Sequence, residues 1–178
     1  MLQQLRDATR SIHDELEQLS GVDKIMDQSI DRTGYERILE VNYHTYATVE
    51  KKIAPYLSVQ PISSRIAMDL NHPPSNNAET FNYHLHSKDE ALGAKYVLEG
   101  SMLGASLIAR ALQDCVKLQP LSEQHFYKKA TKESMADWPS LMNELKEVPS
   151  DSAQAQDIIT GALRTFNLFK RNYLQLRA

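Results

Sequence analysis

Apolar residues recur at every third or fourth position over most of the chain, which is the spacing of amphipathic helices. In the first stretch these positions are Leu2, Leu5, Ala8, Ile12, Leu16 and Leu19. In the last stretch they are Ile158, Ala162, Phe166, Phe169, Tyr173 and Leu176. We therefore expect a long amphipathic helix at each end, the first ending near Gly21, a natural C-terminal breaker.

Caps and helix breakers place further helices between these two. One is predicted to begin near Asp31, a plausible N-cap, and to end near Pro55. A shorter helix is expected over residues 62–70, stopped by Pro73 and Pro74. The polar, Asn-rich stretch that follows carries no clear pattern, so no element is assigned to it.

The second half of the chain is predicted to be helical as well. Ser87 and Glu90 have the spacing of a capping box, so a long helix is expected from there to about Val116. The remaining predicted helices cover residues 122–132, 137–148 (with Pro139 in its first turn) and 151–176. The expected fold class is all-α, with one domain spanning residues 1–178, about seven helices and no strand.

Composition narrows the kind of protein. The chain has 178 residues, 42% of them hydrophobic and 24% charged, which suits one ordinary globular domain. A net charge of -3 and a pI near 6.1 argue against general nucleic-acid binding. One cysteine, Cys115, excludes an intramolecular disulfide and fits a reducing compartment.

The sequence also indicates where the protein works. The first residues, MLQQLRDATR, contain no apolar core of a signal peptide. The least polar long stretch, Tyr96 to Leu112, is too short to span a bilayer and is interrupted by Glu99 and Arg110. We therefore predict a cytoplasmic protein that binds neither nucleic acid nor membrane.

His13 is the first candidate for chemistry, because it flanks the apolar stripe of the first helix. Glu17 follows one turn later, within reach of an imidazole nitrogen. A metal-bound histidine needs its second nitrogen held by a carboxylate, a carbonyl or water, and this spacing provides such a partner. Arg6 lies two turns earlier on about the same face, placed to meet an anion. On spacing alone, a purely structural histidine is the commoner outcome, and both interpretations remain open.

The second candidate is the segment Tyr96 to Ala105, in which Gly100 and Gly104 interrupt a strongly helical stretch. Each glycine costs ~1 kcal/mol relative to alanine inside a helix, so some gain must offset them. One explanation is close packing of two helices. The other is a backbone that lies against a flat ligand and bends there, with Ser101 beside it.

Both segments resemble signature segments of the heme oxygenase family. Residues 5–17, LRDATRSIHDELE, look like the proximal helix in which a histidine binds haem iron. Residues 96–105, YVLEGSMLGA, resemble the distal helix of the bacterial, phytochrome-associated branch, with its EGSxLG core. Residues 42–46, 126–127 and 137–138 are compatible but less specific. The resemblance spans most of the chain in the right order.

The resemblance implies a role for each matching residue. His13 would be the proximal iron ligand, Glu17 its hydrogen-bonding partner, and Arg6 the basic residue near a haem propionate. Gly100 and Gly104 match the two distal glycines that crowd the open face of the haem. Further propionate candidates, without a secure match, are Lys128, Lys129, Lys132 and Arg164.

The chain departs from its relatives at two distal positions. Ser101 stands where some members have an aspartate that organises water near bound oxygen, and Ala105 stands where many have a third glycine. Gly100, Ser101 and Gly104 are therefore the candidates for the oxygen-activating side. Because both departures touch that side, the resemblance supports haem binding more strongly than turnover.

The activity implied by the resemblance is the opening of haem, at once cofactor and substrate, by O₂ to biliverdin, CO and Fe²⁺. The sequence has no Rossmann fingerprint and no flavin motif, so electrons are expected from a separate donor, a ferredoxin or a flavin reductase. A biliverdin acceptor is a further candidate partner.

Three other interpretations stay open. A haem carrier or sensor could keep the fold and His13 without turnover. A haem-free enzyme of the related thiaminase-like fold would leave the distal segment unexplained. His84 and His86 suit a metal site on an extended segment, but the sequence offers no evident third ligand.

Overall fold

The computed structural model describes residues 1–70, 72, 82–127 and 132–175. The regular secondary structure of these residues consists of helices, which turns and loops connect. The helices are α1 (Leu2–Leu19), α2 (Val22–Met26), α3 (Arg32–Ile53), α4 (Ile62–Asp69), α5 (Lys88–Ser101), α6 (Ala105–Asp114), the 3-10 helix η1 (Val116–Leu118), α7 (Lys132–Glu147) and α8 (Ala153–Gln175). The prediction of an all-α fold is confirmed. No helix in these ranges is long and apolar enough to cross a membrane.

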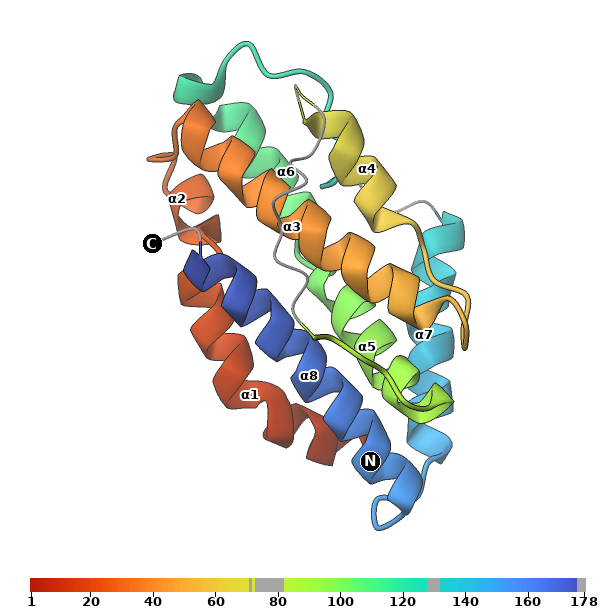
Figure 1. Cartoon of the computed structure of the whole chain (residues 1–178). Helices are drawn as coiled ribbons and strands as arrows, with labels where there is room; N and C mark the ends of the chain where they lie inside the picture. Colours follow the sequence, from red (N-terminus) through yellow and green to blue (C-terminus); the bar gives the residue numbers. More distant parts are fainter. Residues whose placement is uncertain (71, 73–81, 128–131, 176–178) are drawn as a thin grey trace.

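The C-terminal helix α8 lies at the centre of the molecule (Figure 1). It packs against α5, α1 and α3, while α3 also packs against α4 and α5. The stripe predicted for α8 is buried at Ile158, Ala162, Phe166, Phe169 and Tyr173; Leu176 lies outside the described residues. One continuous apolar core therefore runs along α8 and joins the first and second halves of the chain.

α1 and the α5–α6 pair are linked by three shared neighbours. Both α1 and α5 pack against α8 and against α7, and α2, which follows α1, packs against α6. The first helix and the glycine-containing segment are distant in sequence, yet they belong to one framework. α1 and the α5–α6 pair therefore lie around the same neighbouring helices.

α5 and α8 touch backbone to backbone through two glycines that the sequence analysis did not single out. A Cβ atom built on Gly93 would lie 1.9 Å from the carbonyl oxygen of Ile158. A Cβ built on Gly161 would lie 2.0 Å from the carbonyl oxygen of Glu90. Neither position has room for any side chain, so this pair of glycines determines how closely α5 approaches the central helix.

The long helix predicted from Ser87 to Val116 is interrupted. α5 ends at Ser101 and α6 begins at Ala105, with turn residues between them. The interruption falls inside the glycine-containing segment, where a bend was one of the two explanations offered by the sequence. The five-residue α2 was not predicted, because it is too short to show a hydrophobic period.

The predicted helix over residues 122–132 is wrong in its described part, since residues 121–127 are not helical. Two side chains of α4 instead bind the backbone of His125 and Phe126. Arg65 donates to the carbonyl oxygens of His125 and Phe126, each at 2.8 Å, and the carboxylate of Asp69 accepts from both N–H groups at 2.7 Å. These tertiary bonds replace the bonds that a helix would make.

α7 begins at Lys132, five residues before the predicted start at Asp137. Pro139 therefore lies inside the helix rather than in its first turn. The predicted start at Asp137 put Pro139 in the first turn, where a helix tolerates proline. The observed helix instead lacks one backbone hydrogen bond at Pro139.

Candidate functional site

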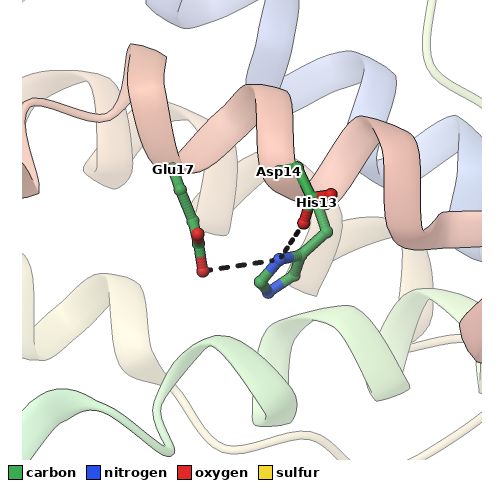
Figure 2. Close-up of side chains that lie close together, drawn as sticks. All are labelled: His13, Asp14 and Glu17. Atoms are coloured by element: carbon green, nitrogen blue, oxygen red, sulfur yellow. Dashed lines mark ion pairs between the residues drawn. The ribbon is translucent and has the colours of Figure 1, made fainter.

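His13 lies on α1 with its imidazole 57% exposed. Its Nδ1 is 3.5 Å from Oε1 of Glu17, the partner expected from the spacing, and 3.9 Å from Oδ1 of Asp14, which the sequence analysis did not consider. Figure 2 shows the ring and the Glu17 side chain extending from the same side of α1. The edge of the ring packs against Phe166 of α8, with centroids 6.1 Å apart. Because both carboxylates face Nδ1, the Nε2 nitrogen is left for another ligand.

His13, Asp14 and Glu17 form the one group of three metal-ligating side chains found close together among the described residues. His84 and His86, by contrast, have ring centroids 6.2 Å apart, and no third ligand joins them in the described part of the chain. The structure thus adds nothing to the proposal of a separate metal site on that segment.

Of the basic residues considered as anion partners, Arg6 is exposed on α1 and forms no ion pair with any residue that the structure describes. Its neighbour Arg10 is bound to Asp7 at 3.1 Å. Lys128 and Lys129 lie outside the described residues, as does the side chain of Lys132. Arg6 therefore remains available to an anionic group.

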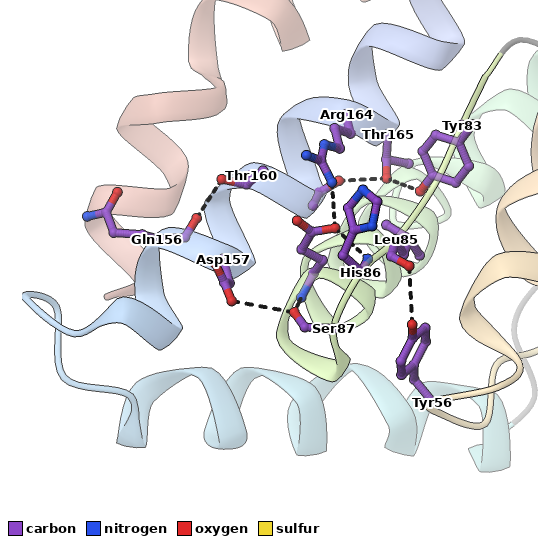
Figure 3. A network of polar contacts seen from close by, with 12 residues as sticks. Tyr56, Tyr83, Leu85, His86, Ser87, Gln156, Asp157, Thr160, Arg164 and Thr165 are labelled. Carbon is purple, nitrogen blue, oxygen red and sulfur yellow. Dashed lines mark hydrogen bonds and ion pairs between the residues drawn. The ribbon is translucent and has the colours of Figure 1, made fainter.

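Arg164 has a different role from the one considered for it. Its Nη1 lies 2.6 Å from Oε2 of Glu90, a carboxylate that is 8% exposed (Figure 3). The same Glu90 oxygen accepts the backbone N–H of His86 at 2.8 Å, while the Ser87 hydroxyl accepts the N–H of Glu90 at 3.1 Å. The predicted capping box is therefore confirmed for Ser87, whereas the Glu90 carboxylate reaches one residue further back and joins α5 to α8.

The two glycines of the distal segment have opposite surroundings. A Cβ on Gly104 would meet no described atom within 4 Å, whereas a Cβ on Gly100 would lie 3.3 Å from Cη2 of Trp138. Beside Gly104, the side chains of Leu103 and Leu107 are 62% and 65% exposed. Gly104 and the two leucines thus form an open apolar surface, and Gly100 is a site of close packing. Close packing of two helices therefore explains Gly100, while Gly104 has no packing partner among the described residues.

Ser101 is held by a buried tyrosine, Tyr46, which the sequence analysis included only in the less specific match over residues 42–46. The hydroxyl of Tyr46 on α3 lies 2.5 Å from Oγ of Ser101. Ser101 donates its own proton to the carbonyl oxygen of Leu98 at 2.7 Å, so Tyr46 is the donor in the pair. Burial raises the pKa of Tyr46 far above its ordinary value, which keeps this donor protonated. A buried tyrosine needs such a partner, and this is the signal that could have identified it.

Glu99, next to Gly100, points away from solvent and is 8% exposed. Lys95 lies 3.4 Å from its carboxylate, yet neither carboxylate oxygen accepts a hydrogen bond from a described residue. Burial raises the pKa of Glu99, Lys95 opposes that shift, and the nearby Asp137 adds to it. The protonated form is therefore favoured by folding.

This shift predicts a pH-dependent effect of Glu99→Gln. A carboxyl whose pKa is raised by folding contributes most stability below its unfolded pKa of about 4.3, and that contribution is lost as pH rises through the folded value. Relative to wild type, Glu99→Gln is expected to be more stable at pH 7, with the difference shrinking toward pH 4. Urea unfolding at both pH values measures it, with Glu144→Gln on the exposed face of α7 as control. A difference that does not change with pH contradicts the assignment.

Comparison with known proteins identifies the fold and the family. Among solved structures, the chain resembles heme oxygenase-1 from the cyanobacterium Synechocystis in complex with heme, with a TM-score of 0.67 and 17% sequence identity. The match covers 98% of this chain and 90% of that one. A search of curated proteins finds no match. The sequence model of the family described as "Heme oxygenase" matches residues 1–75 and 74–174, nearly the whole chain. The chain therefore belongs to the heme oxygenase family.

Proposed function

We propose that the chain is a heme oxygenase that holds haem between α1 and the α5–α6 segment, with His13 as the iron ligand. The observation that carries the proposal is the orientation of His13, whose Nδ1 faces Glu17 and Asp14. Haem, bound as cofactor and substrate, supplies the iron that takes up O₂ and the ring that is opened to biliverdin, CO and Fe²⁺. Family membership favours this function over that of a haem-free, thiaminase-like enzyme.

The residues present suit such a ligand. An exposed imidazole on one side offers Nε2 to iron, and the open apolar surface of Gly104, Leu103 and Leu107 offers a flat ring a place to lie. Arg6, on the helix of His13, has no ion-pair partner among the described residues and is suited to a propionate. At Gly100 the same segment packs against Trp138 of α7.

The carboxylates beside Nδ1 determine the state of His13. A proton on Nδ1 is stabilised by Glu17, with Asp14 as a second acceptor slightly further away. Nε2 then keeps its lone pair, which is the form that ligates a metal. The two carboxylates also restrain the rotation of the ring, so that Nε2 keeps one direction.

On the other side, the Tyr46–Ser101 pair replaces the aspartate found in some relatives. Ser101 accepts a hydrogen bond from Tyr46 and donates one to the carbonyl oxygen of Leu98, so its remaining lone pair can accept a hydrogen bond from water. We assign to this pair the ordering of water beside bound oxygen. Electrons come from a separate donor, a ferredoxin or a flavin reductase, since the sequence carries no motif for a bound nucleotide or flavin.

Ser101→Ala tests this assignment. The variant is expected to bind hemin with wild-type affinity and to form biliverdin about tenfold more slowly, which corresponds to the loss of one hydrogen bond of about 1.4 kcal/mol in the transition state. Single-turnover absorption spectroscopy with a chemical reductant and O₂ gives the rate. Ser106→Ala, at an exposed position of α6, is the control. Equal rates in Ser101→Ala and wild type contradict the role.

A haem carrier or sensor is the second candidate, and the observation that favours it is Ser101, which stands where some relatives have an aspartate. Purified protein with hemin, O₂ and a reductant distinguishes the two functions. An enzyme converts the haem spectrum to that of biliverdin, and a carrier leaves the haem intact.

A further inference from the structure

Trp138 of α7 occupies the notch left by the missing side chain of Gly100. Two atoms of its indole ring, Cη2 and Cζ3, lie 3.3 and 3.5 Å from the position that a Cβ on Gly100 would take. Among the described residues, no other side chain comes within 4 Å of that position. The glycine is therefore matched to this one ring, and a larger residue at position 100 would displace it.

The same ring is stacked on Tyr96, one helical turn before Gly100. The two ring centroids are 5.5 Å apart and the planes are inclined by 29°. Trp138 thus covers two successive turns of α5 immediately before the helix ends at Ser101. The last turn of α5 is held on its α7 side by this single aromatic residue.

α7 is itself well placed to fix this position. It packs against α1, the helix of His13, as well as against α5. Asp137, next to Trp138, accepts a hydrogen bond from Nε2 of Gln60 at 2.8 Å, which ties this part of α7 to the segment after α3. A change in the contact between Trp138 and α5 therefore moves the end of α5 relative to α1.

We propose that Trp138 is a positioning residue for ring opening, which fixes the end of α5 and so sets where Ser101 and Gly104 stand relative to a haem held by His13. The inference rests on the proposed function and deepens it. Trp138 acts through Gly100 and Tyr96. The position of ring attack depends on how the distal segment limits the bound oxygen, so the mixture of biliverdin isomers reports the placement of that segment.

The test compares biliverdin isomers formed by Trp138→Leu, Trp138→Phe and wild type, separated by chromatography. Trp138→Leu is expected to lower the share of the main isomer at least about twofold, because displacements of about 1 Å in an active site have large effects on rate. Trp138→Phe keeps an aromatic ring over Tyr96 but lacks the Cη2 and Cζ3 atoms that meet Gly100, so its mixture is expected to lie between those of Trp138→Leu and wild type. Met142→Ala, one turn along α7, is the matched control for loss of apolar packing. A folded Trp138→Leu protein with the wild-type mixture overturns the proposal.

A second measurement separates failure of this inference from failure of the proposed function. Trp138 is the only tryptophan of the chain, so the fluorescence of the haem-free protein reports its surroundings alone. Gly100→Ala is expected to shift the tryptophan emission, while Gly104→Ala leaves it unchanged, since only Gly100 faces the ring. Identical emission in both variants overturns the positioning contact. If hemin fails to bind wild type while the emission shifts, the proposed function fails and the contact stands.

Discussion

Gly93→Ala is expected to remove about 3 kcal/mol or more of stability, a large share of the roughly 5–15 kcal/mol that holds a typical domain folded. The added methyl group would lie 1.9 Å from the Ile158 carbonyl oxygen and 2.8 Å from the Ala162 nitrogen. Both atoms belong to the backbone of α8, so no side-chain rotation can relieve the clash. α5 must move away from the central helix, and the packing between them is lost along its length.

Urea unfolding followed by circular dichroism measures this effect, and Gly104→Ala is the matched control. It is the same chemical change in a position with a negative φ of -85° and no described atom within 4 Å of the new methyl group. Its stability is expected to equal or slightly exceed that of wild type, because alanine has fewer unfolded conformations than glycine. Equal stability of the Gly93 and Gly104 variants would mean that α5 and α8 do not meet as described.

Gly104→Leu is expected to have the opposite profile, with an intact fold and hemin affinity reduced by more than about tenfold, or 1.4 kcal/mol. The haem-free protein has open space at this position, so the leucine side chain costs little there. In the proposed complex the same space faces the flat ring, which the leucine would displace. Hemin titration gives the affinity, and thermal unfolding of the haem-free variant confirms that the fold is intact.

Ser106→Leu, on the exposed face of α6, is the control for Gly104→Leu. It adds a similar side chain two residues away and is expected to leave hemin affinity unchanged. Gly34→Ala would not serve, because a Cβ on Gly34 would lie 3.1 Å from Oδ1 of Asp31, the cap of α3. If Gly104→Leu binds hemin as tightly as wild type, the surface around Gly104 is not the place of the ring.

The elements that the sequence predicted well are those with a strong local signal. α8 buries one face over about five turns, and the apolar positions of α1 pack against the core at Leu5 and, partly buried, at Leu2, Ile12, Leu16 and Leu19, while Ala8 is exposed; both stripes are therefore visible in the sequence. The helix predicted over residues 122–132 is wrong for a physical reason that lies elsewhere in the chain. Their backbone is held by Arg65 and Asp69 of α4, and no local pattern contains that information.

The same distinction applies to the site. The pairing of His13 with Glu17 follows from helical spacing and could be predicted. The bond between Tyr46 and Ser101 joins residues 55 positions apart. The contact of Trp138 with Gly100 depends likewise on how α7 meets α5. Local sequence indicates that glycines at positions 100 and 104 need an explanation, but only the tertiary structure shows that their surroundings differ.

Titration of the haem-free protein with hemin, for wild type and His13→Ala, tests the central claim most directly. The account predicts a saturable Soret band with one haem per chain for wild type, and an affinity more than about tenfold lower for His13→Ala, since loss even of an outer partner of a metal ligand costs ~10–100-fold. His84→Ala, at an exposed histidine outside the site, should bind hemin as wild type does. A His13→Ala protein with the wild-type band and affinity would contradict the assignment of His13 as the iron ligand.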